Sequence, residues 1–385
     1  MANFGLLRQF QIYGNGKPVG HITAEQWAAA AEEAMEPGPF GYLHGNAGAH
    51  STTQANAEAF ARWQIRPRML RNVGVRDWSC ELFGAKIAMP LLLAPIGVQS
   101  IIHPDGELAT AQAAKDTGTP FVLSTVSSYS MEKIADILPA ALRWFQVYPG
   151  RDWDVMASMI ARAEALGYAA LVITVDTPLL AWRPMDLNSA YLPFLQGHGM
   201  ANYLTDPVFR SRLKETPEEN PEAAIQLFLS TYVNPEFDWS DLKRLRAMTR
   251  LPVLVKGLTH PDDARLALEA RMDGIIVSNH GGRQVDGAVA ALDMLPQIVS
   301  AVGADVPVLF DSGIRSGAHI AKALALGARA VLVGRPYAYA LAAGGQDGVR
   351  QYIEDLRADF DLQMALSGAA NLEHWDRSCL NESHP

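Results

Sequence analysis

The sequence predicts an α/β protein with a (β/α)8 TIM-barrel fold, an N-terminal helical cap and a long lid-like loop after the fourth strand. Eight short apolar runs recur along the chain, each ends in polar or glycine residues, and alanine-rich segments with helical spacing follow them. Uninterrupted apolar strands fit burial on both faces, as in a parallel sheet covered by helices. Eight such strand–helix pairs over roughly 250 residues are what this barrel requires.

The runs are defined by their β-branched and leucine content. In chain order they are Pro90–Gly97, Pro120–Thr125, Arg143–Pro149, Ala170–Thr177, Pro252–Gly257, Gly274–His280, Pro307–Gly313 and Ala330–Pro336. Helical segments such as GELATAQAAKDTG close near a glycine, which is a common helix stop. An open doubly wound sheet is the alternative, but the dinucleotide fingerprint GxGxxG is absent after the first run. We therefore favour the barrel.

We interpret the chain as a single domain, residues 1–385. Residues 1–89 form the cap, with helical patterns over Ala24–Met35 and Thr53–Trp63; residues 90–345 form the barrel and residues 346–385 the C-terminal helices and tail. Within the barrel, residues 179–237 are too long for an ordinary connection, and such loops are usually functional or disordered. Its aromatic residues favour an ordered lid; they are Trp182, Tyr191, Phe194, Tyr203 and Phe209.

Composition restricts the class of protein. The chain is 49% hydrophobic and 19% charged, with a net charge of −9 and no run of like charges, which argues against a nucleic-acid partner. No apolar stretch of about 18 residues predicts a membrane span, and the first residues lack the features of a secretory signal. Cys80 and Cys379 are too few for a zinc cage or a disulfide framework. We expect a cytoplasmic protein with an organic cofactor and no metal site.

Polar residues stand at nearly every exit from an apolar run, and the carboxyl ends of barrel strands form the active site. After the last two runs, DSGIRSG and VGRP combine glycines, a helix start and the cations Arg315 and Arg335. Glycines let the backbone approach a ligand, and free N–H groups at a helix start bind phosphate. These loops therefore predict a phosphorylated cofactor or substrate; ordinary turns are the alternative.

Lys256 and His280 each end a predicted core strand. A buried lysine must find an anion or lower its pKa, so Lys256 is interpreted as a Schiff-base lysine, a cation beside an anionic ring or an ion-pair partner. His280 can accept a proton near pH 7, and Arg283, with Arg183 as a second clamp, can bind a carboxylate. Asp176 can orient the imidazole. Together they predict deprotonation of a small substrate that carries a carboxylate.

Several motifs together resemble the FMN-dependent α-hydroxy-acid oxidases and dehydrogenases. They are APIGV, FQVY, ITVDTP with its following arginine, LVKG, SNHGGRQ, FDSGIRSG and VGRP, all in family order from about Tyr13 to the final helices. Within that family, the segments IYGNG, YLHGNAGAHSTTQAN, YLPFLQG and NYLTDPVF are most similar to the lactate 2-monooxygenases. The resemblance implies FMN as cofactor, a small 2-hydroxy acid and O2 as reactants, and a homo-oligomer, either a tetramer or an octamer.

The resemblance also implies a role for each matching residue. His280 would be the base with Asp176 as its partner, Arg183 and Arg283 would bind the substrate carboxylate, and Tyr42 and Tyr148 would hydrogen-bond the substrate, with Tyr148 among the catalytic groups. Lys256 would lie beside the flavin ring and stabilise its reduced form. The other implied FMN contacts are Ala94, Pro95, Ile96, Gly97, Ser124, Gln146, Thr174, Ser278, Asp311, Ser312, Gly313, Arg315, Gly334 and Arg335.

The chain departs from the family pattern at three places. Acidic residues usual after the Tyr42 segment are replaced by a neutral stretch that includes Asn46 and His50, and Val126 stands where some members carry tryptophan. Gly97 replaces an alanine beside the flavin, and the missing methyl group is expected to change the space for O2 and the residence of product.

We therefore expect oxidation of L-lactate by O2 to acetate, CO2 and water. The alternatives are an oxidase that releases the 2-oxo acid and hydrogen peroxide, a lyase or aldolase that uses Lys256, and a non-catalytic binding protein, which would need no base.

Overall fold

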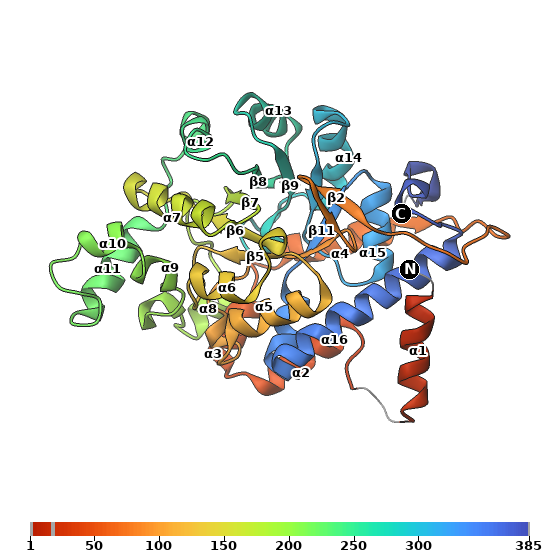
Figure 1. The fold of residues 1–385 in the computed structure, drawn as a ribbon, viewed down its shortest axis with the longest axis horizontal. Helices are drawn as coiled ribbons and strands as arrows, with labels where there is room; N and C mark the ends of the chain where they lie inside the picture. The colour runs from red at the N-terminus through yellow and green to blue at the C-terminus, as the bar shows by residue number, and fades with distance from the viewer. Residues whose placement is uncertain (1–2, 17–19, 384–385) are drawn as a thin grey trace.

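The protein forms a closed barrel of eight parallel strands, so the predicted fold class is confirmed (Figure 1). This computed structural model describes residues 3–16 and 20–383; the predicted cap and tail also contain residues 1–2, 17–19 and 384–385, which lie outside that description. Around the barrel the strands follow the order β10-β11-β4-β5-β6-β7-β8-β9. Their bounds are β4 Leu91–Leu93, β5 Phe121–Ser124, β6 Arg143–Val147, β7 Ala170–Thr174, β8 Val253–Leu258, β9 Gly274–Val277, β10 Val308–Phe310 and β11 Ala330–Val333.

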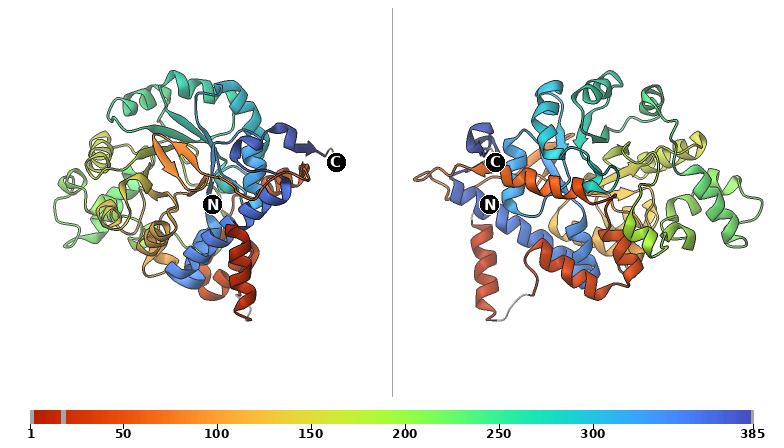
Figure 2. Two further views of the ribbon diagram at one scale, coloured as in Figure 1. Left: turned by 45° about the vertical axis from the view of Figure 1, so that its right-hand side comes forward. Right: turned by 180° about the vertical axis from the view of Figure 1, so that it is seen from behind.

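The strands are apolar on both faces because both faces are buried. One face fills the barrel interior, where Leu92, Val122, Trp144 and Leu254 belong to one packed cluster. The other face packs against an outer ring of helices, seen around the strands in both views of Figure 2. Those helices are α5 Gly106–Thr117, α6 Met131–Ile137, α7 Trp153–Ala165, α12 Trp239–Arg246, α13 Pro261–Glu269, α14 Ala291–Val302, α15 Gly317–Ala325 and α16 Arg335–Ser367.

Several predicted apolar runs continue past the true strand ends. β9 ends at Val277 rather than His280, and β10 ends at Phe310 rather than Gly313. The physical reason is backbone conformation, since His280 (φ 57°) and Ser312 (φ 81°) lie in the left-handed region, which no strand can use. The polar residues after these strands therefore belong to loops at one end of the barrel.

The N-terminal region is mainly helical, as expected, with α1 Phe4–Gly14, α2 Ala24–Ala34, α3 Pro37–His44 and α4 Ser51–Arg62. The prediction of helix over Thr53–Trp63 was wrong by one residue at its end, because Trp63 opens strand β1, Trp63–Ile65. Helix α2 begins with a capping box between Thr23 and Gln26, and it packs on α16. A non-helical backbone at Gly345 divides α16 into two helical parts.

A short hairpin that the sequence did not reveal closes the other end of the barrel. Strands β2 (Cys80–Leu82) and β3 (Ala85–Ile87) are joined by the two-residue turn Phe83–Gly84, both with positive φ, as hairpin turns of this kind require. Leu82 and Ile87 pack into the same cluster as the interior strand residues. Because the hairpin closes this end of the barrel, a ligand has to enter at the opposite end.

The two ends of the chain are joined outside the barrel. Strand β1 pairs antiparallel with β12 (Leu380–Glu382). The fully buried Asp361 of α16 accepts a hydrogen bond from the Gly5 amide (2.8 Å) and forms an ion pair with Arg76 (2.6 Å). Helix α1 also packs along α16. The earliest and latest segments of the sequence therefore form one continuous outer layer.

The predicted lid segment, residues 179–237, is ordered and contains four α-helices, α8 Pro184–Asn188, α9 Ala201–Leu204, α10 Pro207–Ser211 and α11 Pro221–Thr231, and one 3-10 helix, Pro193–Gln196. Helices α9–α11 lie at one end of the long axis of the molecule (Figure 1). Phe194 and Phe209 are buried, whereas Trp182 is 75% exposed and adds nothing to the packing. No helix of residues 3–16 or 20–383 is long and apolar enough to cross a membrane.

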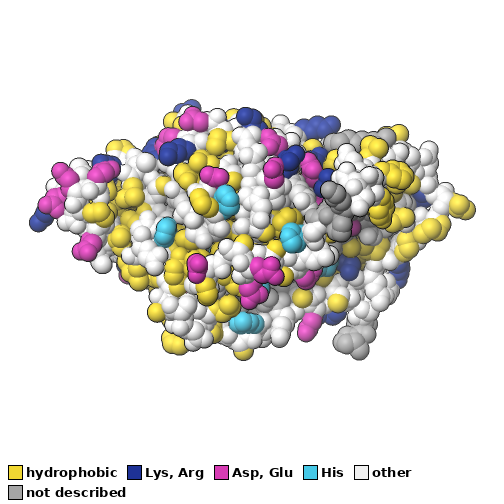
Figure 3. All heavy atoms as spheres, turned by 90° about the horizontal axis from the view of Figure 1, so that it is seen from below, with side chains coloured by type: hydrophobic (Ala, Val, Ile, Leu, Met, Phe, Trp, Pro, Cys, Tyr) yellow, Lys and Arg dark blue, Asp and Glu magenta, His cyan; other side chains and the backbone are white. Residues whose placement is uncertain are grey.

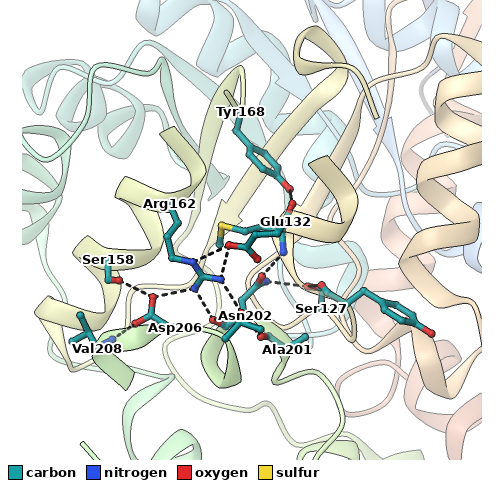
Figure 4. Close-up of polar contacts among 12 residues, drawn as sticks. Ser127, Glu132, Ser158, Arg162, Tyr168, Ala201, Asn202, Asp206 and Val208 are labelled. Atoms are coloured by element: carbon teal, nitrogen blue, oxygen red, sulfur yellow. Dashed lines mark hydrogen bonds and ion pairs between the residues drawn. The ribbon is translucent and has the colours of Figure 1, made fainter. Parts of the chain in front are cut away.

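A buried polar network anchors this insertion to the barrel (Figure 4). The side-chain amide of Asn202 donates to the carbonyls of Ser124 (3.2 Å) and Thr125 (3.1 Å) and to Ser127 Oγ (2.9 Å). Arg162 of α7 donates to the Asn202 carbonyl at 2.9 Å and bridges Glu132 and Asp206. The insertion is thereby fixed to the loop that follows β5, so it forms a rigid wall of the cavity at that end.

Candidate active site

A cavity opens at the carboxyl ends of the strands. Most of the predicted site residues line it: Tyr42, Ala94, Pro95, Ile96, Gly97, Tyr148, Arg183, Lys256, His280, Arg283, Asp311, Ser312, Gly313, Arg315, Gly334 and Arg335. The remaining predicted residues are not among its lining residues; they are Ser124, Gln146, Thr174, Asp176 and Ser278. Asp176 contacts His280, Ser278 contacts Lys256, and Ser124 contacts Val126.

His280 forms a short contact with Asp176, 2.7 Å from Nδ1 to Oδ1. An ionised carboxylate only accepts, so the proton lies on Nδ1 and Nε2 carries the free lone pair. Thr177 Oγ1 donates to the same carboxylate oxygen at 3.0 Å and fixes its position. His280 lines the cavity, and its left-handed backbone turns the ring out of the strand direction. The pair has the geometry of an oriented general base.

The charges around the pair keep it in the reactive protonation state. Burial alone would raise the pKa of Asp176, but His280 and Lys256 lower it to about 2, so the carboxylate is ionised. Burial lowers the pKa of His280, and the attraction of Asp176 offsets only part of that effect. The imidazole is therefore neutral at pH 7 and able to accept a proton.

Lys256 reaches the same centre from β8. Its Nζ donates to Ser278 Oγ (2.9 Å) and lies 3.3 Å from Asp311 Oδ2 and 4.0 Å from Asp176 Oδ2. Burial would lower the pKa of Lys256, but the two carboxylates outweigh it and raise the pKa. A Schiff-base lysine needs a neutral amine, so this environment disfavours the lyase or aldolase alternative.

Two arginines also line the cavity. Arg283 donates only to backbone carbonyls, including that of Tyr42 at 2.7 Å, and no carboxylate of the described residues forms an ion pair with it. Burial and the neighbouring charge of Arg183 lower the pKa of Arg283 to about 9, which still leaves it charged at pH 7. Arg183 donates to Gln284 Oε1 at 2.6 Å and has Asp186 at 3.8 Å. A bound carboxylate would relieve this excess of buried positive charge.

Two tyrosines border the same part of the cavity. Tyr42 and Tyr148 are half-buried, and burial raises the pKa of each hydroxyl, so both remain protonated donors at neutral pH. The Arg283 guanidinium lies 5.6 Å from the Tyr42 ring centre, within cation–π range. The structure thus brings Tyr42 and Tyr148 together with His280 and both arginines around one cavity, as the sequence led us to expect.

The predicted phosphate loops also line the cavity. Gly313 (φ 112°) brings the backbone close to the wall, and Arg315 and Gly334 lie beside it. Arg335 donates to Asn46 Oδ1 (2.6 Å) and to the Gly281 carbonyl, and no carboxylate among residues 3–16 and 20–383 pairs with it. Burial lowers the pKa of Arg335 to about 10, so the cation is present and suited to an anionic group.

The ends of β5, β6 and β7 leave two polar atoms without partners. Gln146 accepts from Ser124 Oγ at 2.9 Å through Oε1, yet its Nε2 has no hydrogen-bond partner in the described chain. The buried hydroxyl of Thr174 has none there either. A buried polar group without a partner costs about 1–3 kcal/mol, so these atoms suit a polar ligand.

Gly97 lies against Val126 of the neighbouring loop. A Cβ at position 97 would come 2.5 Å from Val126 Cγ2 and 2.6 Å from the Val126 carbonyl oxygen. Both residues line the cavity. The space beside Gly97 is therefore occupied by Val126 on this side, where a methyl group at position 97 would otherwise stand.

Sequence reasoning missed several residues that shape the site. Gln284 links Arg183 to the carbonyl of Asp176, to which its amide donates at 2.9 Å. Asn46 holds Arg335, and Tyr232 of the insertion lines the cavity. Gln284 belongs to SNHGGRQ, so its motif was a usable signal, whereas Asn46 and Tyr232 belong to no strand-end pattern.

The geometry combines an oriented imidazole with buried cations in one cavity, which suits proton transfer on an anionic ligand, and the comparisons identify the class of protein. The described residues hold no group of three His, Cys, Asp or Glu side chains suited to a metal ion. A family model described as FMN-dependent dehydrogenase matches residues 31–382. This chain belongs to that family and is an FMN-dependent oxidoreductase.

Its relatives match over nearly their whole length. An L-lactate oxidase of Lysinibacillus sphaericus is 42% identical over 344 residues, which cover 89% of this chain and 88% of that protein. The 2-hydroxyacid oxidase 1 of Homo sapiens is 39% identical over 366 residues, covering 94% and 97%. A crystal structure of mandelate oxidase superposes with a TM-score of 0.83 at 38% identity, covering 94% of this chain and 98% of that one.

The residues present fit FMN. Gln146 Nε2 and Thr174 Oγ1 would be available to polar parts of the cofactor, Lys256 would supply a fixed cation for its reduced ring, and Arg315 and Arg335 would offer positive charge to its phosphate. Most of the predicted cofactor residues therefore line this one cavity.

Proposed function

We propose that this enzyme oxidises L-lactate with O2 and converts it to acetate, CO2 and water. The observation that carries the proposal is the neutral His280, held by Asp176 at 2.7 Å, in one cavity with two arginines. Arg283 forms no ion pair with a carboxylate of the described residues, and Arg183 has only Asp186, at 3.8 Å. A proton acceptor and a carboxylate clamp together suit a small 2-hydroxy acid.

Each residue of the proposed active site has a separate role in the reaction. Arg183 and Arg283 bind the substrate carboxylate, and the hydroxyls of Tyr42 and Tyr148 donate hydrogen bonds to the substrate. His280 takes a proton at Nε2, and Asp176 stabilises the imidazolium that forms. FMN, when bound, accepts the two electrons of the oxidation and passes them to O2.

Product retention distinguishes the two possible outcomes. The network around Asn202 fixes the insertion, and Val126 fills the space beside Gly97, so the wall around the product is close and rigid. A 2-oxo acid held beside newly formed hydrogen peroxide would be decarboxylated before it leaves. These features support the monooxygenase reaction.

A second candidate is the simpler oxidase, which releases the 2-oxo acid and hydrogen peroxide. The relatives named L-lactate oxidase and 2-hydroxyacid oxidase favour it.

Product analysis tests the proposal. The purified holoenzyme is given L-lactate in air, acetate and pyruvate are counted by NMR, and peroxide is measured by a coupled assay. Acetate in near-stoichiometric yield without free peroxide is expected. Equal amounts of pyruvate and peroxide would establish the oxidase instead. A flavin-containing protein inert to lactate would move the search to bulkier 2-hydroxy acids.

We further propose a cytoplasmic homo-oligomer, a tetramer or an octamer. Around the insertion, large apolar side chains are exposed, among them Leu179 (59%), Trp182 (75%) and Leu187 (51%), and such patches favour protein contacts. Hydrophobic side chains also reach the surface at several places on the face in Figure 3. Light scattering of the holoenzyme would give the mass; a monomer would contradict the proposal.

A further inference from the structure

The connection from β9 to α14, residues 278–290, carries both His280 and Arg283. Three consecutive residues in it have a left-handed backbone: His280 (φ 57°), Gly281 (φ 65°) and Gly282 (φ 79°). Glycine adopts this conformation freely, but at a residue with a side chain it costs about 1–3 kcal/mol and persists only where the surrounding structure holds it. The backbone of His280 therefore depends on contacts from outside its own loop.

The start of helix α4 makes such contacts along the second half of the connection. The exposed Asp286 accepts hydrogen bonds from the Ala49 amide (2.6 Å) and the Ser51 amide (2.9 Å). Its carboxylate therefore lies at the N-terminus of α4, where negative charge is stabilised. The buried hydroxyl of Thr52 donates to the Val285 carbonyl at 2.7 Å. This half of the connection is thereby fixed to α4.

Asn56, further along α4, holds both ends of the connection. Its side chain is 3% exposed and forms a reciprocal pair with Asn279, which is 9% exposed: Asn56 Nδ2 donates to Asn279 Oδ1 at 2.9 Å, and Asn279 Nδ2 donates to Asn56 Oδ1 at 2.8 Å. The same Oδ1 of Asn56 accepts from the amide of Ala291, the first residue of α14, at 3.1 Å. One side chain thus binds the residue before His280 and the start of the next helix.

The contacts of Asn279 extend to the other side of His280. The Asn279 amide and the Gly281 amide both donate to Ser312 Oγ, at 3.2 Å and 3.1 Å. The two residues that flank His280 are therefore held together, and Asn56 holds them against α4. Asp176 follows β7 and lies outside this connection, so a displaced loop would carry the imidazole away from the carboxylate that lies 2.7 Å from it.

We propose that Asn56 is a positioning residue for His280, which fixes the backbone on either side of the base so that the imidazole keeps its contact with Asp176 and faces the substrate. This role belongs to a helix of the N-terminal cap, outside the barrel itself. The inference rests on the proposed function only in taking His280 as the base, and it holds for either product, acetate or the 2-oxo acid.

The test compares Asn56→Leu with the wild-type holoenzyme. Leucine is similar in volume but can neither donate nor accept, so the three hydrogen bonds of Asn56 are lost. Stopped-flow absorbance measures how fast saturating L-lactate bleaches FMN without O2, and calorimetry measures the Kd for pyruvate. A displacement of about 1 Å can cost about 100-fold in rate, so bleaching should slow by about 10- to 100-fold. The pyruvate Kd should stay unchanged, because the Tyr42 carbonyl (2.7 Å) holds Arg283 independently of α4.

Two further variants complete the test. Thr249→Val is the matched control, because it also removes a buried hydrogen bond, from Thr249 Oγ1 to Glu164 Oε2 (2.8 Å), before the start of β8 and away from the cavity. It should lower the stability to urea without slowing the bleaching. Asp286→Ala changes an exposed residue and so does not endanger folding; it frees the second half of the connection and should slow bleaching by a smaller factor.

The outcomes keep the two proposals apart. A wild type that yields pyruvate and peroxide refutes the monooxygenase reaction, while the bleaching rates still decide the role of Asn56. If L-lactate does not bleach the wild type, the proposed substrate is wrong, and the same rates are measured with a bulkier 2-hydroxy acid. Bleaching at the wild-type rate in Asn56→Leu, or in Asp286→Ala if Asn56→Leu does not fold, would overturn the inference. A loss of rate matched by an equal loss of pyruvate affinity would also overturn it, because Asn56 would then support the whole site rather than the base.

Discussion

Gly97→Ala is expected to destabilise the protein through a contact that the structure defines in detail. The new Cβ would lie 2.5 Å from Val126 Cγ2 and 2.6 Å from the Val126 carbonyl oxygen, about 1 Å inside ordinary contact. Val126 must then move, although its carbonyl accepts a hydrogen bond from the Val98 amide at 2.9 Å. Overpacking of this kind costs about 1–3 kcal/mol, and weakening the hydrogen bond adds about 1 kcal/mol.

A loss near 3 kcal/mol corresponds to a fall of about 4 °C in Tm for 385 residues, at about 2.1 cal/mol/K per residue. Urea unfolding and thermal scans of the FMN-bound protein measure it. Gly344→Ala is the control, because a Cβ there meets nothing within 4 Å, and it should be neutral or slightly stabilising.

Adding Val126→Ala to Gly97→Ala separates the two contacts. It removes Cγ2 but leaves the carbonyl oxygen at 2.6 Å, so only part of the lost stability should return. The displacement of Val126 in Gly97→Ala also widens the cavity beside the product, so the fraction of product that this variant releases as acetate should fall. A Gly97→Ala protein as stable as the wild type, or a double variant with no recovery, would refute this reasoning.

Three other variants test separate parts of the structure. Asp176→Asn should slow turnover about 100-fold or more, and the acid limb of kcat/KM against pH should move to lower pH, because Asp176 raises the pKa of His280; a shift to higher pH would contradict the assignment. Asn202→Asp removes the amide that donates to the Ser124 carbonyl (3.2 Å), so urea unfolding should show a loss of at least about 2 kcal/mol, and unchanged stability would exclude the anchoring role. Burial lowers the pKa of His319 to about 4. As the pH falls, the unfolded chain therefore takes up a proton at this histidine before the folded chain does, and about 3 kcal/mol of stability that is present above pH 6.5 is lost toward pH 4. His319→Gln should flatten that part of the curve of stability against pH, and an unchanged curve would contradict the assignment.

The barrel could be predicted because the signal for each strand lies within a few consecutive residues of the sequence. Each strand is a short apolar run with a helix after it, and burial on both faces leaves no ambiguity of period. The β2–β3 hairpin could not be predicted from the sequence, because strands of three residues such as CEL and AKI carry no periodic signal. Its stability comes from packing Leu82 and Ile87 into the barrel interior, a tertiary contact.

Some residues of the candidate site could also be predicted from the sequence, and others could not. His280, Lys256 and Asp176 were found because strand ends in a barrel converge, whatever the loops do. Asn46 and Tyr232 could not be found by that rule, because helix packing brings them to the cavity from outside the strand–helix repeat; Asn46 is 289 residues from its partner Arg335. The effect of Gly97 also needed coordinates, since only the position of the neighbouring loop shows what fills the missing methyl.

The joined outer layer has a consequence for how the chain is made in the cell. Arg76 and Asp361 are separated by 285 residues, so at about 5–20 residues per second Arg76 leaves the ribosome about 15–60 s before its partner exists. During that interval the exposed apolar surface of the nascent N-terminal segment is a substrate for chaperones. Substitution of Asp361 would remove the carboxylate with which the waiting Arg76 pairs, so the outer layer could not close in this way and the yield of folded protein should fall.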